Sequence, residues 1–133
     1  MDKFGETRWF TTVFLLFTLP TIAVADVRIT YLCKGEQTTE GGDITPVTKP
    51  VMAYYTIELS NKSGRYFSWE DQQWRPIYAI KGHLMHLTND NEMGHWWSLA
   101  IDRDTGAWDE AWVGGQSTTD VTGRCRKVPL REP

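Results

Sequence analysis

The three histidines of the chain, His83, His86 and His95, fall within one short stretch, and histidine is a common protein ligand of transition metals. His83 and His86 are three positions apart, so on a strand their side chains would point to opposite faces. No Asp, Glu or Cys stands at a matching offset to complete a set of ligands. We therefore expect no metal site, and no sequence pattern calls for another cofactor.

Acidic residues also surround a glycine at position 106, with Asp102 and Asp104 before it and Asp109 and Glu110 after it. Calcium-binding loops alternate oxygen ligands in this way and use a glycine for their sharp turn. Here a third alternating acid before the glycine and an acid at the closing position of the loop are both missing. A hairpin turn stabilised by an Asp side chain explains the same residues, and this is the structure we expect.

Catalysis by general acid and base, or by a nucleophile, needs paired groups held in one pocket. The sequence has none of the spacings that mark such groups, such as G-x-S-x-G, H-E-x-x-H or a glycine-rich phosphate loop. Catalytic residues can be scattered along a chain, so an enzyme is not excluded. The sequence nevertheless favours a protein that is not an enzyme, and it nominates no catalytic residue.

Tryptophan is the most unusual component: the chain has seven, and six of them follow residue 25. On strands, Trp97 would share a face with Leu99, while Trp108 and Trp112 would flank Glu110. If exposed, Trp96, Trp108 and Trp112 would form a flat stacking platform for sugar rings, or an anchor for a protein partner. The alternative is an aromatic core that uses these side chains on both faces.

The elements that must position these residues are strands, because apolar residues after residue 26 recur mainly at every second position. Two polar stretches, 36–50 and 89–94, are interpreted as loops, and Pro76 restricts its segment to an edge or a bulge. About eight strands are expected, at 27–33, 52–60, 65–69, 73–80, 83–88, 95–102, 107–113 and 118–128. The pattern predicts an all-β antiparallel meander, rolled into a small barrel or folded as a sandwich.

Two cysteines, Cys33 and Cys125, lie in the first and last expected strands. In an oxidising compartment this even count predicts one disulfide that joins those strands. A reactive or metal-binding thiol pair is the alternative, but the C-x-x-C spacing typical of such pairs is absent.

The first 25 residues have the order of a secretory signal peptide. Lys3 and Arg8 precede an apolar run at 10–19, and small residues end at Ala25. We expect cleavage after Ala25, a single domain at 26–133, no transmembrane segment after processing, and a periplasmic or secreted location. The run of about ten apolar residues is too short to cross a bilayer, which needs about twenty.

The net charge of −3 is the same with or without residues 1–25, because that segment carries two basic and two acidic residues. Nucleic acids and anionic membrane surfaces attract basic stripes, and no such stripe is visible. A nucleic-acid partner is therefore not expected.

Two segments near the end resemble those of small exported proteobacterial proteins of unassigned function. The shared patterns are I-D-R-x-T-G at 101–106 and G-R-C-R-K at 123–127. The resemblance implies a strand-turn-strand unit followed by a last strand, whose cysteine pairs with one near the start. It implies a fold and a compartment, without an activity.

The chain is also similar to the periplasmic inhibitors of C-type lysozyme, which are small barrels. The order of Y-L-C-K-G at 31–35, S-G-R-Y at 63–66 and K-G at 81–82 carries this similarity. It implies that Ser63 and Lys81 reach into the lysozyme cleft. The alanine that the inhibitors carry between glycine and arginine, and the Trp before the lysine, are missing here.

Together these observations predict an exported, non-catalytic binding module with a protein or glycan partner in the cell envelope. Inhibition of C-type lysozyme and binding of a glycan or small ligand on an aromatic face are the two specific alternatives.

Overall fold

The computed structural model describes residues 27–60 and 63–133. The expected signal peptide lies outside the described residues. The described chain is all β, which confirms the predicted fold class, and its nine strands form one antiparallel sheet. The strands are β1 (Val27–Gly41), β2 (Ile44–Leu59), β3 (Gly64–Ser68), β4 (Gln73–Pro76), β5 (Ala79–Lys81), β6 (Leu84–Glu92), β7 (His95–Asp102), β8 (Ala107–Gly114) and β9 (Ser117–Val128).

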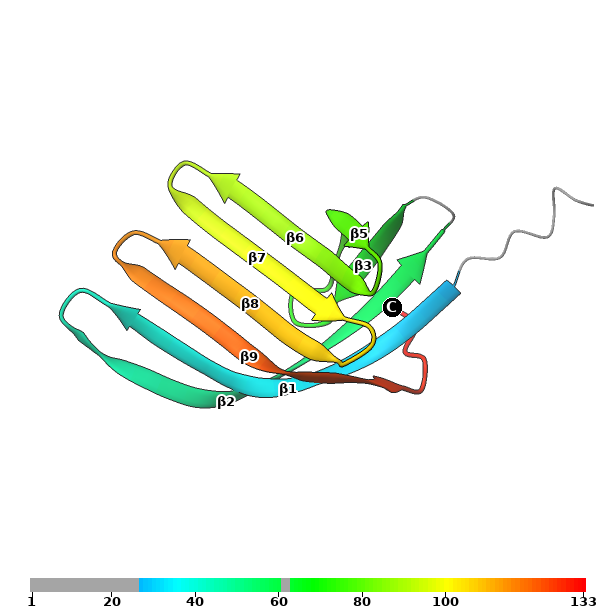
Figure 1. The fold of residues 1–133 in the computed structure, drawn as a ribbon, viewed down its shortest axis with the longest axis horizontal. Helices are drawn as coiled ribbons and strands as arrows, with labels where there is room; N and C mark the ends of the chain where they lie inside the picture. The colour runs from blue at the N-terminus through cyan, green and yellow to red at the C-terminus, as the bar shows by residue number, and fades with distance from the viewer. Residues whose placement is uncertain (1–26, 61–62) are drawn as a thin grey trace, which may run out of the picture.

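The sheet has the order β4-β3-β2-β1-β9-β8-β7-β6-β5 and curls into an incompletely closed barrel (Figure 1). Its two edges come together at the segment between β4 and β5. There the Ile77 amide donates to the Gly64 carbonyl of β3 at 2.9 Å, and the Tyr78 amide donates to the Leu87 carbonyl of β6 at 3.1 Å. The chain therefore crosses from one edge of the sheet to the other within a few residues.

This crossing accounts for the ninth strand. The segment 73–80 was predicted as one strand, but its first part pairs with β3 and its last part pairs with β6. Pro76 ends β4 at the sheet edge, as expected, because a proline has no amide hydrogen for a further ladder bond.

The prediction of loops at 36–50 and 89–94 was wrong, because both stretches lie mostly in strands. Three long hairpins, β1–β2, β6–β7 and β8–β9, extend the sheet on one side of the barrel (Figure 1), and we call this side the hairpin end. The β1–β2 hairpin is rich in threonine, and Thr38 and Thr48 hydrogen-bond across it at 3.0 Å. Polar β-branched residues form strands even where they have no core to cover.

The outer half of β2 is a free edge, because β3 pairs only with residues 55–59. The Tyr54 carbonyl points away from β1, since it accepts from the Trp69 amide. By alternation, Pro50 also presents its backbone nitrogen on that edge. A proline there removes no ladder bond and blocks pairing with another chain.

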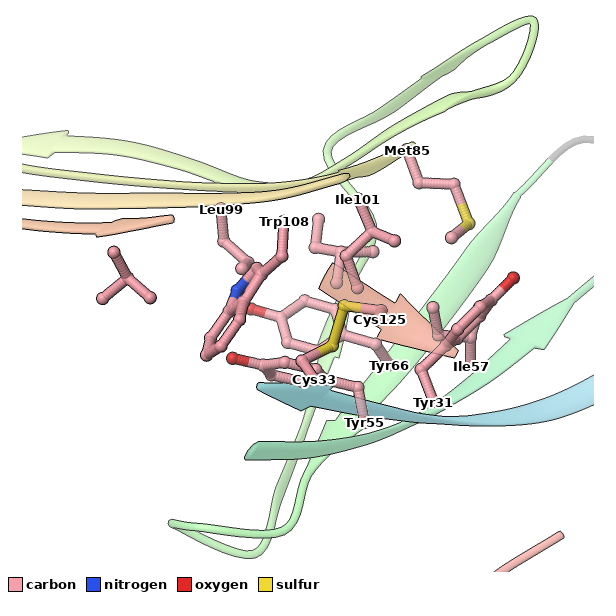
Figure 2. Packing of buried hydrophobic residues seen from close by; sticks show 12 residues of the cluster. Tyr31, Cys33, Tyr55, Ile57, Tyr66, Met85, Leu99, Ile101, Trp108 and Cys125 are labelled. Carbon is pink, nitrogen blue, oxygen red and sulfur yellow. A yellow bond between two sulfur atoms is a disulfide. The ribbon is translucent and has the colours of Figure 1, made fainter. Parts of the chain in front are cut away.

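The core lies inside the curl and is centred on the disulfide between Cys33 of β1 and Cys125 of β9 (Figure 2). The prediction of a bridge between first and last strands is confirmed. The two cysteines are directly opposite each other in the pairing of β1 and β9. Tyr66, Ile57, Met85, Leu87, Leu99 and Ile101 are among the fully buried side chains around it.

Two glycines let β1 and β9 approach beside the disulfide. Gly35 pairs with Gly123, and a Cβ atom on Gly35 would lie 2.1 Å from the Thr122 carbonyl oxygen. A Cβ on Gly123 would lie 2.2 Å from the Lys34 carbonyl oxygen. No other residue type fits at this contact without a shift of the backbone.

Candidate functional site

The inner face of the sheet opens toward the hairpin end into two adjoining hollows. The inner hollow, of about 330 Å³, is lined by polar and aromatic residues that include Tyr55, Glu70, Asp71, Arg75 and Glu110. The outer hollow, of about 350 Å³, lies among the hairpins and includes Asp90, Glu92, His95, Ser117 and Thr119. Trp97 and Trp112 line both hollows. We call the two hollows together the groove.

The pairing register of β7 and β8 places the two tryptophans side by side. Trp97 is directly opposite Trp112, and their rings are nearly parallel, with 8° between the planes and 6.3 Å between the centroids. Trp112 keeps 37% of its surface exposed. The Arg75 guanidinium carbon lies 5.2 Å from the Trp97 ring centre, so a protein cation already packs on this pair.

Glu110 lies beneath Trp97 and Trp112. It is an acidic residue in a core position, with 7% of its surface exposed. One carboxylate oxygen accepts from the Trp97 indole nitrogen at 2.9 Å, and the other accepts from the Tyr55 hydroxyl at 3.4 Å. Burial raises the pKa of Glu110 to about 7, against the two hydrogen bonds that lower it. The hydrogen bond to Glu110 also fixes the orientation of the Trp97 ring.

Arg75 and Asp71 form an ion pair at the inner hollow. The hydrogen bond from Arg75 lowers the pKa of the Asp71 carboxyl, so this acid is charged at neutral pH. The Nη1 atom of Arg75 is buried and has no partner within the described part of the chain. The hydroxyl of Tyr66, another residue of this hollow, bonds to Thr88.

This arrangement suits a ligand that has flat apolar faces and many hydroxyl groups. Aromatic rings stack on such faces, and carboxylates and a guanidinium bond to the polar groups around them. A carboxylic acid with a pKa near 7 beside charged carboxylates is also the group pair that glycoside hydrolysis uses. Glu110, however, is almost completely covered, and both of its oxygens already accept hydrogen bonds from the protein.

The three tryptophans predicted to form a platform do not form one surface. Trp112 lies in the groove, but Trp108 is 2% exposed and packs in the core against Tyr55. Trp96 is next to Trp97 on β7, so its side chain points to the opposite face of the sheet, where its indole donates to Asn89 at 3.0 Å, although Trp96 is also among the residues that line the outer hollow. The aromatic pair that the structure does form is Trp97 with Trp112.

Ser63 and Lys81 are both exposed and lie at the end of the sheet away from the hairpin end. Ser63 precedes β3, and Lys81 ends β5. Ile77, in the segment between β4 and β5, donates to the carbonyl of Gly64, the residue that follows Ser63. The structure thus separates these two residues from the groove.

The acidic turn at 102–106 is the Asp-stabilised hairpin turn that the sequence predicts. The Asp102 carboxylate accepts from the amides of Asp104 at 2.8 Å and Thr105 at 3.1 Å. Gly106 has a positive φ of 79°. His83 lies near this turn, with a nitrogen 3.5 Å from an Asp102 oxygen. Within residues 27–60 and 63–133, no three His, Cys, Asp or Glu side chains form a cluster that could hold a metal ion.

Sequence reasoning did not identify Tyr55, Asp71, Arg75, Trp97 or Glu110 as site residues. One signal was present: Glu110 falls between Trp108 and Trp112 on the inward-facing positions of its strand, where an acid needs partners. Arg75 and Asp71 gave no signal, because only the curl of the sheet brings β4 near β7.

The sequence matches no family model and no curated protein. In the described ranges, no helix has the length and apolar character needed to cross a membrane.

Proposed function

We propose that this protein is an exported, non-catalytic binding domain that takes a carbohydrate of the cell envelope in its groove. The observation that carries the proposal is the parallel pair of Trp97 and Trp112 at the junction of two hollows. A stacking surface with polar groups on both sides is the usual construction of a site for sugar rings. The partly exposed Trp112 is the side chain on which a ring would lie.

Export is part of this proposal. It is supported by the signal-peptide pattern at 1–25 and by the disulfide, since disulfides persist in oxidising compartments such as the periplasm. If the chain is expressed in a bacterial host, the protein from the periplasmic fraction should begin at Asp26. Recovery of unprocessed protein with reduced cysteines from the cytoplasm would contradict the proposal.

The binding experiment is a calorimetric titration of the oxidised domain with chito-oligosaccharides and with soluble peptidoglycan fragments. We expect Trp112→Ala to weaken binding at least tenfold, which is about 1.4 kcal/mol. Trp74→Ala is the matched control, because Trp74 is a half-buried tryptophan that packs against Arg65 and Phe67 and lines neither hollow. Equal effects of the two substitutions would overturn the assignment of the groove.

The same samples test for catalysis. If the domain only binds, the oligosaccharides should be recovered intact after prolonged incubation. The release of shorter products, lost in Glu110→Gln, would show instead that the acid under the tryptophans performs hydrolysis.

The second candidate is inhibition of C-type lysozyme through Ser63 and Lys81. The observation that favours it is that both residues are exposed on turns at one end of the sheet. In a lysis assay, an inhibitor would lose its effect in the double variant Ser63→Ala and Lys81→Ala, and would keep it in Trp112→Ala. Because the two sites lie at opposite ends of the sheet, the two sets of variants separate the two functions.

A further inference from the structure

The charges of the groove indicate which carbohydrate it takes, an inference that rests on the proposed function. Asp90 and Glu92 line the outer hollow, and Glu70 lines the inner one. None of these three forms an ion pair with another described residue. The one lysine or arginine among the lining residues of either hollow is Arg75, and its charge is paired with Asp71.

The unpaired acids lie next to the aromatic pair. Asp90 on β6 is directly opposite Trp97 on β7, and Trp97 is directly opposite Trp112 on β8. These three residues thus form one row across the inner face of three strands. Glu92 is two positions further along β6 and faces His95. A ring stacked on Trp112 would therefore have carboxylates within the adjoining hollow.

The aromatic faces, like the carboxylates, favour a positively charged ligand. The face of an indole carries negative electrostatic potential, and it attracts ammonium and guanidinium groups. Arg75 already shows this preference, since its guanidinium packs over Trp97. The carboxylates of Asp90, Glu92 and Glu70 would repel an acidic sugar. A neutral sugar would leave these carboxylates without a partner of opposite charge.

We propose that the groove recognises an oligosaccharide whose rings carry free primary amines, such as a de-N-acetylated amino-sugar chain. The apolar face of one ring stacks on Trp112. The ammonium groups of that ring and its neighbour pair with Asp90 and Glu92. Recognition of this ligand needs the aromatic pair and the acids together, because the acids alone would bind any cation.

The test is a titration of the full domain with three probes at about pH 6, where sugar amines are protonated. The probes are a glucosamine tetramer, its fully N-acetylated counterpart, and spermidine. We expect the glucosamine tetramer to bind at least tenfold more tightly than either of the others, and to weaken as salt is raised. The double variant Asp90→Asn and Glu92→Gln should remove this preference.

Glu36→Gln with Glu40→Gln is the matched control, because it neutralises two exposed acids of β1 away from the groove. Tighter or equal binding of the acetylated tetramer would overturn the amine preference and leave carbohydrate binding intact. Spermidine that binds as tightly as the glucosamine tetramer would show a plain cation site and overturn the sugar class. Binding of none of the probes would overturn both the inference and the proposed function.

Discussion

Replacement of Glu110 by glutamine tests whether a protonated carboxyl is built into the core. The folded protein holds the pKa of Glu110 near 7, against an ordinary value of 4.5, because burial disfavours the charged form. A raised pKa means that the folded state binds the proton more tightly than the unfolded state does. The stability due to this group is therefore complete below about pH 4.5 and is lost as the pH rises through 7.

The size of this loss follows from the two pKa values. The difference between about 7 and 4.5, at about 1.4 kcal/mol for each pKa unit, gives about 3 kcal/mol. Glutamine keeps the shape and the hydrogen bonds: its oxygen can accept from the Trp97 indole, and its amide can donate to the Tyr55 oxygen. It cannot ionise, so the loss should vanish in the variant.

The assay is urea unfolding of the oxidised protein followed by tryptophan fluorescence, from about pH 4 to pH 8. The free energy of unfolding of the native protein, minus that of Glu110→Gln, should fall by about 3 kcal/mol across this range. Asp109→Asn is the control, because Asp109 is the exposed neighbour on the opposite face of β8. Parallel pH curves for the native protein and Glu110→Gln would refute the assignment of a neutral, buried Glu110.

Three further variants test how the barrel is held together, each by urea unfolding. Removal of the disulfide by Cys33→Ser with Cys125→Ser should cost roughly 4 kcal/mol, since the bridge closes a loop of 92 residues; an unchanged midpoint would contradict this. Gly35→Ala should destabilise by about 2 kcal/mol or more, because its Cβ would meet the backbone of β9, and a neutral result would show that β1 and β9 can separate there. Thr56→Val should cost about 1–3 kcal/mol, because the buried hydroxyl donates to the Arg131 carbonyl and accepts from the Trp69 indole; no loss would mean that water replaces it.

The fold class could be predicted from the sequence because strand alternation and turn residues are local signals. Cys33, Ile57, Leu99 and Cys125 fall on inward positions of their strands and form the core as expected. The long β1–β2 hairpin was missed because its strands carry threonine in place of apolar residues. Propensity for strands and burial in a core are separate properties, and only the second gives the alternating apolar pattern.

The site was harder to predict because its residues come from strands that are far apart in the sequence. Trp112 was identified, but its partner had been assigned to the core because Trp97 alternates with Leu99 and Ile101. The structure shows that one inward face changes along its length, from core at Ile101 to groove at Trp97. Arg75 reaches this place because residues 76–79 cross between the edges of the sheet, a feature that no local pattern encodes.

The measurement that tests carbohydrate binding in the groove most directly is a two-dimensional amide and indole NMR spectrum, recorded with and without a chito-oligosaccharide. The indole signals of Trp97 and Trp112 should shift on addition of the sugar, while that of Trp74, which lines neither hollow, stays in place. Shifts confined to residues near Ser63 and Lys81, or a spectrum that the sugar leaves unchanged, would contradict the account.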